Sequence, residues 1–151
     1  MRLLAERCID LACPVEQAFL YATNLEHFGE WFPGVLAIRS DDGLAPTVVG
    51  KRYQETVAVP GRGRRQVEIT VREALPLRFL ATEGAFPPLL PRMEMAFEVI
   101  ADGHCRVTWR MFSRNTGGLA RWTLIPLARA VLSARAGKGL RALKQRLENS
   151  A

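Results

Sequence analysis

The acidic residue best suited to a chemical role is Glu55, which lies between Tyr53 and Val57 in a stretch typical of a strand. Side chains alternate between the two faces of a strand, so Glu55 points inward if Tyr53 and Val57 do. An apolar pocket raises the pKa of a carboxyl group and suits it to general acid or base catalysis. With help from Tyr53, such a carboxyl group would act as the general acid or base of an enzyme. The alternative is that Glu55 pairs with an arginine or lies near an opening of the pocket to solvent.

Other residue types that perform catalysis lack a supporting context. His27 and His104 are far apart in the chain and the three cysteines form no CxxC pair, so we expect no metal site. The segment 61–65 (GRGRR) lacks the third glycine of a dinucleotide loop and lies between two predicted strands. It is interpreted as a basic hairpin tip, and we expect no cofactor.

The elements that must position Glu55 follow from the hydrophobic pattern. Residues 2–12 alternate like a half-buried strand, with Leu3, Ala5, Ile9 and Leu11 on the inner face. Two short helices follow, one beginning at Pro14 and one after Asn24. Six more strands are predicted at residues 35–40, 51–59, 65–73, 77–82, 92–100 and 105–114.

A long helix is predicted at residues 119–148, interrupted or kinked near Pro126. It carries one apolar stripe that must pack on the sheet, made of Ile125, Ala128, Leu132, Ala136, Leu140, Leu143 and Leu147. The 151 residues contain no linker or repeat, so we expect a single domain over residues 1–151. We find no secretory signal and no apolar stretch of membrane-spanning length, and unpaired cysteines are typical of a reducing compartment. These features predict a cytoplasmic protein.

Four stretches of the chain carry a family resemblance. Residues 14–19 (PVEQAF), 24–35 (NLEHFGEWFPGV), 49–53 (VGKRY) and 140–148 (LRALKQRLE) resemble the START-like superfamily, in its polyketide cyclase/dehydrase and lipid-transport branch (SRPBCC). The resemblance implies an α+β helix-grip fold. In that fold a curved antiparallel seven-stranded sheet wraps around a long C-terminal helix, with two short helices after the first strand.

The resemblance also implies a function, the binding or transport of a hydrophobic small molecule in a cavity between the sheet and the C-terminal helix. A lipid, an isoprenoid quinone or a polyketide-like aromatic would be such a ligand. The superfamily shares no common catalytic triad, so a cyclase or dehydratase that uses Glu55 remains the alternative. The sequence leaves the oligomeric state open.

The side chains predicted to line this cavity are mostly large and apolar, which suits an apolar or aromatic ligand. They are Trp31, Phe32, Tyr53, Val57, Ile69, Val71, Phe79, Met93, Met95, Phe97, Trp109, Met111 and Trp122. Gly137 and Gly139 are interpreted as leaving room beside the sheet. The apolar stretch 84–91 is expected to border the entrance. Alternatively, the same side chains fill the interior as ordinary core.

The net charge of +6 is concentrated at the C-terminal end. Residues 119–151 hold seven bases and one acid, whereas the first 118 residues balance to zero. These bases lack the aromatic interleaving that stacks nucleobases, so we expect no nucleic-acid partner. The apolar run 122–127 between Arg121 and Arg129 is a pattern that makes transient contact with an anionic membrane. The alternative is a buried helix start beside a solvated basic face.

Overall fold

The computed structural model describes residues 1–149, which form one antiparallel sheet and four helical segments. The strands are β1 (Arg2–Leu11), β2 (Val35–Ser40), β3 (Arg52–Val59), β4 (Gly63–Leu75), β5 (Phe79–Ala85), β6 (Pro91–Ala101) and β7 (His104–Ser113). The helices are α1 (Val15–Thr23), the 3₁₀ helix η1 (Leu25–Glu30), α2 (Gly118–Trp122) and α3 (Leu124–Asn149). The strand order is β1-β7-β6-β5-β4-β3-β2, so the first strand pairs with the last.

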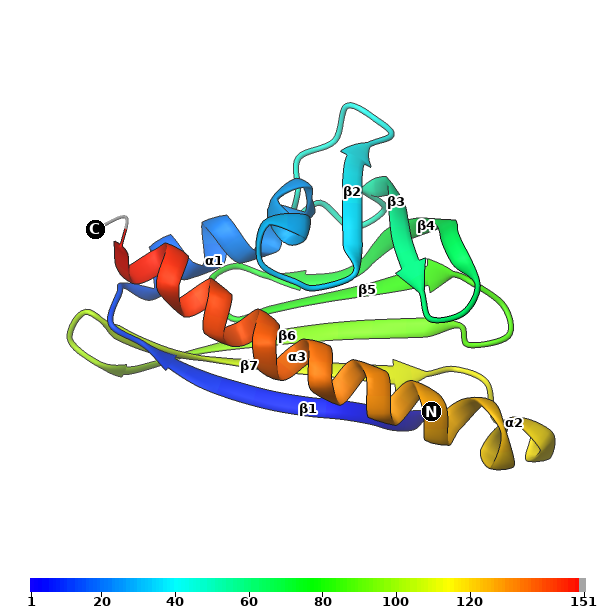
Figure 1. The fold of residues 1–151 in the computed structure, drawn as a ribbon. Helices are drawn as coiled ribbons and strands as arrows, with labels where there is room; N and C mark the ends of the chain where they lie inside the picture. The colour runs from blue at the N-terminus through cyan, green and yellow to red at the C-terminus, as the bar shows by residue number, and fades with distance from the viewer. Residues whose placement is uncertain (150–151) are drawn as a thin grey trace.

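The sheet curves around α3, which crosses its concave side from one end to the other (Figure 1). The helix packs chiefly along β1, while η1 packs against β2 and α1 contacts β6 and β7. This arrangement is the α+β helix-grip fold, and the prediction of a seven-stranded sheet around a long C-terminal helix is confirmed.

The hairpin of β6 and β7 shows how the sequence pattern builds the concave face. A turn at Asp102–Gly103 sets the register, with Gly103 at a positive φ of 68°. Met95 then lies opposite Trp109, and Met93 lies opposite Met111. Met93, Met95 and Trp109 are buried, whereas alternate residues such as Glu94 face the other side. The inward orientation predicted for Met93, Met95 and Trp109 is therefore what the hairpin shows.

The predictions for β1 and β5 are wrong near the start of each strand, in each case because of a local backbone feature. Leu3 is exposed and Leu4 is buried instead, because the pairing of β1 with β7 shifts between Leu3 and Ala5. The strand predicted at 77–82 begins later, at Phe79, and continues to Ala85. Leu77 lies before it in the turn, where it has a positive φ of 62°.

The break in the C-terminal helix falls at Thr123, between α2 and α3. Pro126 therefore occupies the first turn of α3, where its missing N–H leaves no helical hydrogen bond unmade. The predicted interruption is confirmed, three residues before the proline. Of the predicted stripe, Ala128 and Leu132 are half-buried and the other five residues are buried, so it packs inward as expected.

Candidate functional site

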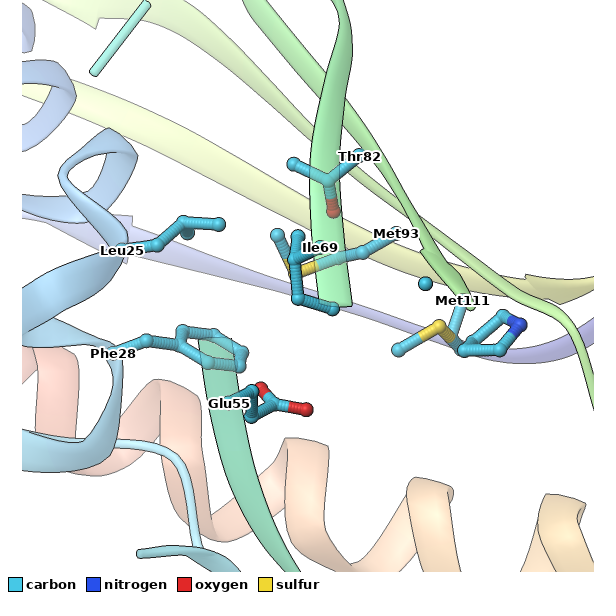
Figure 2. A pocket seen from close by; sticks show the side chains of 9 residues that line it. Leu25, Phe28, Glu55, Ile69, Thr82, Met93 and Met111 are labelled. Atoms are coloured by element: carbon cyan, nitrogen blue, oxygen red, sulfur yellow. The ribbon is translucent and has the colours of Figure 1, made fainter. Parts of the chain in front are cut away.

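A small pocket of about 60 Å³ opens on the concave face of the sheet, beside η1 (Figure 2). Its lining comes from η1 and five strands, and consists of Leu25, Phe28, Glu55, Ile69, Thr82, Gly84, Pro91, Met93 and Met111. None of these nine residues belongs to α3. The pocket therefore lies against the sheet and η1, whereas the sequence predicted a cavity between the sheet and the C-terminal helix.

Glu55 provides the carboxyl group of this pocket. It lies in the middle of β3, paired with Ile38 of β2 and Val67 of β4, and its side chain points into the pocket (Figure 2). Burial among apolar groups raises the pKa of Glu55 to about 7, and no charged neighbour contributes to the shift. The side chain is half-buried, so it keeps some contact with solvent. Pairing with an arginine, the first alternative for Glu55, is not what the structure shows.

The pocket combines this carboxyl group with apolar walls and one hydroxyl. Thr82 lies on β5, is almost fully buried, and turns its hydroxyl oxygen toward the pocket (Figure 2). A carboxyl group with a pKa near 7 is present at neutral pH in both its protonated and its ionised form. Glu55 can therefore donate a hydrogen bond in one form and accept it in the other. Both actions are available to a general acid or base.

Tyr53, the proposed helper of Glu55, is not part of the pocket lining. Its ring is fully buried beneath Lys51, whose ammonium nitrogen lies 5.0 Å from the ring centroid. Lys51 in turn forms an ion pair of 2.7 Å with Asp42. Burial raises the pKa of Tyr53 to about 12, so its phenol stays neutral at physiological pH. This arrangement fits a structural role for Tyr53 at the start of β3.

The predicted cavity wall divides into four groups. Ile69, Met93 and Met111 line the pocket. Outside that lining, the following residues are buried in the packed core: Trp31, Phe32, Tyr53, Val71, Met95, Phe97 and Trp109. Val57 and Phe79 are half-buried. Trp122 is 76% exposed. The alternative of an ordinary core thus describes seven of the thirteen residues.

The predicted inward orientation of Trp122 is wrong, and helix geometry explains why. Ala120 faces the interior of the molecule, and a residue two positions further along a helix is turned by about 200°. Trp122 consequently faces solvent, with the guanidinium of Arg121 5.2 Å from its ring centroid. The room expected beside Gly139 is also filled, because a Cβ there would lie 3.1 Å from Phe32.

Five lining residues were not predicted as such: Leu25, Phe28, Thr82, Gly84 and Pro91. The stretch 84–91 was nevertheless expected to border the entrance, and its two end residues line the pocket. The sequence prediction puts Gly84 in the connection because the predicted strand ends at residue 82, whereas β5 continues to Ala85. A Cβ at Gly84 would lie 3.0 Å from Pro91 and 3.1 Å from Val67, so only glycine fits there without crowding the wall.

Within residues 1–149, no group of three or more histidine, cysteine, aspartate or glutamate side chains is placed to hold a metal ion. In the same part of the chain, no helix combines the length and the apolar character needed to cross a membrane.

Fold and pocket together define a helix-grip protein with one carboxyl group in an apolar pocket. The chain belongs to the polyketide cyclase/dehydrase and lipid transport family, whose sequence profile matches residues 3–148. The family resemblance read from the sequence is thereby confirmed. No protein of curated function matches the chain by sequence.

Solved structures with the same fold are similar over nearly the whole chain. The di-domain ARO/CYC StfQ from the steffimycin biosynthetic pathway shares 16% identity and a TM-score of 0.75, over 99% of this chain and 52% of that one. A START superfamily protein from Mycobacterium smegmatis shares 10% identity and a TM-score of 0.76, over 99% of both chains. A protein from Thermus thermophilus shares 12% identity and a TM-score of 0.76, over 97% of this chain and 98% of its own. At such identities these structures establish the fold alone.

Proposed function

We propose that the protein binds a hydrophobic small molecule in the pocket at Glu55, and that this carboxyl group recognises one polar group of the ligand. The observation that carries the proposal is a carboxyl group directed into an apolar pocket, with a pKa raised to about 7 by burial alone. Pockets for small molecules typically combine apolar walls with a few polar groups that fix orientation. The Thr82 hydroxyl supplies a second such group.

The size of the pocket sets a condition on binding. Ligand pockets commonly have volumes of several hundred Å³. This pocket has about 60 Å³, so an organic ligand must displace side chains to enter. Met93 and Met111 form part of the wall, and methionine side chains adapt readily to irregular shapes. Phe28 belongs to a helix of only six residues. We therefore expect the two methionines to be the part of the wall that shifts for a ligand, since Phe28 is stacked on Phe32 in the core.

A comparison of two probes tests this proposal. Naphthalene and naphthol have the same apolar rings, and only naphthol carries a hydroxyl group that Glu55 can recognise. We expect the protein to bind both, naphthol more tightly. Glu55→Leu should weaken naphthol binding about tenfold, the value of one hydrogen bond to an ionisable group, and leave naphthalene binding unchanged or stronger. Gln54→Leu, on the opposite face of β3, is the matched control.

Calorimetric titration measures the affinity of each of the three proteins for each probe, and native mass spectrometry of the purified protein shows any ligand acquired during expression. The proposal would be contradicted if neither probe binds and the purified protein carries no ligand. Equal affinities for the two probes would leave an apolar pocket and remove the role of Glu55 in recognition.

A second function is favoured by the same carboxyl group. A pKa near 7 is the value at which a general acid or base works best at neutral pH, so Glu55 suits a cyclase or dehydratase. An aromatic β-hydroxy ketone would report dehydration through the absorbance of the enone formed. In that case the rate should change with an apparent pKa near 7, and Glu55→Gln should abolish turnover while the ketone still binds. Unchanged turnover in Glu55→Gln would exclude this role.

A further inference from the structure

One corner of the molecule exposes large apolar side chains away from the pocket. We call it the α2 corner and define it as Leu119, Arg121, Trp122, Leu127 and Arg129. Leu119 is 79% exposed, Trp122 76% and Leu127 60%, and the first two are the most exposed large apolar side chains in residues 1–149. Leu119 and Trp122 are three positions apart and so share one face of α2. In Figure 1, α2 projects at one end of the molecule, beyond the sheet.

The charge of the α2 corner is entirely positive. Arg121 and Arg129 flank the apolar segment, and the sequence contains no acidic residue between Asp102 and Glu148. The Arg121 guanidinium lies over the Trp122 ring, and Arg129 donates from Nε to the carbonyl oxygen of Leu3 at 3.1 Å. Both arginines are exposed, so their positive charge is available beside the apolar side chains.

The corner is held firmly and adjoins the pocket. Ala120 and Ile125 form a buried cluster with Leu4, and Met111, which also lines the pocket, packs against this cluster. Arg2 donates from Nη2 to the carbonyl oxygens of Thr116 and Gly117, just before α2. The α2 corner therefore presents its exposed side chains from a fixed position behind one wall of the pocket.

We propose that the α2 corner docks on an anionic lipid surface. Trp122 and Leu119 enter the boundary between headgroups and acyl chains, and Arg121 and Arg129 face the negative headgroups. Tryptophan beside arginine is suited to this interface, because the ring is amphipathic and the guanidinium attracts anionic lipid. A purely apolar partner would gain nothing from the two flanking arginines. Docking itself is independent of the function proposed for the pocket, although it would bring a hydrophobic ligand close to the Met111 wall.

Tryptophan fluorescence tests the proposal directly. Trp31 and Trp109 are buried, so Trp122 is the tryptophan that reports contact at the surface. On vesicles that mix phosphatidylserine with phosphatidylcholine, we expect its emission to shift to shorter wavelength and brominated acyl chains to quench it. Vesicles of phosphatidylcholine alone should give neither effect. Trp122→Phe should lose the signal but still sediment with vesicles, whereas Leu119→Ala combined with Trp122→Ala should lose sedimentation.

The charge requirement is tested with two matched pairs of substitutions. At physiological ionic strength each base near the lipid surface contributes about fivefold in affinity, so Arg121→Gln with Arg129→Gln should weaken vesicle binding about 25-fold. Lys138→Gln with Arg141→Gln removes the same charge further along α3. At about 1.5 Å per residue these bases lie roughly 13 and 18 Å beyond Arg129, more than the Debye length of about 8 Å. We expect this second pair to change binding less than threefold.

Three results would overturn the docking proposal. The first is an absence of binding to anionic vesicles even at low salt. The second is an equal loss from both pairs, which would indicate diffuse attraction by the basic helix. The third is self-association of the protein without vesicles that the Leu119→Ala, Trp122→Ala variant removes, which would assign the corner to a second copy of the chain. Titration of the same variants with naphthol, without vesicles, shows whether the pocket still binds a ligand. A loss of vesicle binding is thereby distinguished from a loss of ligand binding.

Discussion

Two regions of the same concave face are filled in different ways. In the packed region, around Trp109, Phe32 and Gly139, buried side chains are in close contact. The Phe32 and Trp109 ring centroids are 5.0 Å apart, and a Cβ on Gly139 would lie 3.1 Å from Phe32. In the pocket region, around Glu55 and Met111, the same sheet borders a space of about 60 Å³ and a carboxyl group that has no charged partner among residues 1–149.

The difference follows from what covers each region. Gly139 lets α3 approach Phe32 closely, and the buried face of α3 continues through Leu140, Leu143 and Leu147. The pocket region is lined by η1 and the strands, with no lining residue from α3. A helix of six residues, η1 contributes only Leu25 and Phe28 to that lining. The site thus lies where coverage by the long helix gives way to coverage by a short one.

The largest expected effect comes from opening the packed region at its centre. Trp109 is fully buried in β7, so Trp109→Ala should lower the free energy of unfolding by about 3–5 kcal/mol, through lost apolar burial and the cavity left behind. Urea denaturation at equilibrium measures this. Arg110→Ala is the matched control, because its side chain faces the other side of β7 and pairs with Glu6 at the surface, where an ion pair contributes at most about 1 kcal/mol.

The Trp109 variant also tests the division into two regions. If the variant stays folded, its affinity for naphthol should remain close to that of the parent, because Trp109 does not line the pocket. A folded Trp109→Ala protein with strongly weakened naphthol binding would show that the two regions act as one cavity. That outcome would support the sequence prediction that Trp109 lines the ligand cavity.

Glu55 gives the next largest effect, and it depends on pH. Its folded pKa of about 7 lies above that of an exposed glutamate, so the folded state binds more protons than the unfolded state between about pH 4.5 and 7. Stability is therefore highest below this window and is lost as the pH rises through it. A shift of this size corresponds to about 3 kcal/mol above pH 7. Glu55→Gln removes the titrating group and should be more stable than the parent at pH 8.

Denaturant midpoints measured from pH 4 to pH 8 provide the test. The difference between the Glu55→Gln protein and the parent should grow in favour of the variant as the pH rises. Glu16→Gln, an exposed substitution on α1, controls for the loss of one negative charge. A difference that stays constant with pH would mean that Glu55 is solvated like a surface carboxyl group, and the contrast between the regions would then rest on packing alone.

The sequence predicted the packed region better than the pocket. Uninterrupted alternation in β6 and β7 located Met95 and Trp109 correctly, because a period of two fixes each side chain once the turn is known. The inward orientation of Glu55 followed from the same rule. Errors arose where the period is broken, as at the register shift near Leu3 and the helix break at Thr123. Local patterns placed the helix break only near Pro126 and gave no sign of the register shift near Leu3.

The shape of the pocket was not predictable from these patterns, for a physical reason. Whether an inward side chain touches a ligand space or another side chain depends on how closely two elements approach. Gly139 and Gly84 illustrate this, since both lie against close neighbours but only Gly84 lines the pocket. Alternation places both kinds of inward residue on one face and does not distinguish them.

A pair of glycines on α3 tests the close approach in the packed region. A Cβ at Gly139 would lie 3.1 Å from Phe32 and 3.4 Å from Pro33, whereas at Gly137 its nearest neighbour, on Arg141, is 3.8 Å away. Alanine gains about 1 kcal/mol over glycine inside a helix, so Gly137→Ala should raise the free energy of unfolding by up to that amount. Gly139→Ala should lower it by about 1 kcal/mol, because overpacking exceeds the helical gain.

Chemical denaturation of both variants against the parent measures the two opposite changes. Stabilisation by Gly139→Ala as large as that by Gly137→Ala would show that α3 moves freely away from Phe32. The packed region would then be as adaptable as the pocket region, and the comparison between them would fail.

The smallest effect on stability is expected at Gly84, where the effect on binding is the informative one. A Cβ at this position would lie 3.0 Å from Pro91, 3.1 Å from Val67 and 3.3 Å from Ile69, all side-chain atoms. Pro91 and Ile69 also line the pocket, so their side chains border open space into which they can shift. Gly84→Ala should therefore change the free energy of unfolding by less than about 1 kcal/mol.

The added methyl group narrows a space of about 60 Å³, so naphthalene and naphthol should both bind several-fold more weakly. Equal losses for the two probes are expected because the methyl group removes space and leaves Glu55 in place, whereas Glu55→Leu affects naphthol alone. Unchanged binding of both probes to a folded Gly84→Ala protein would show that the ligand does not bind next to β5.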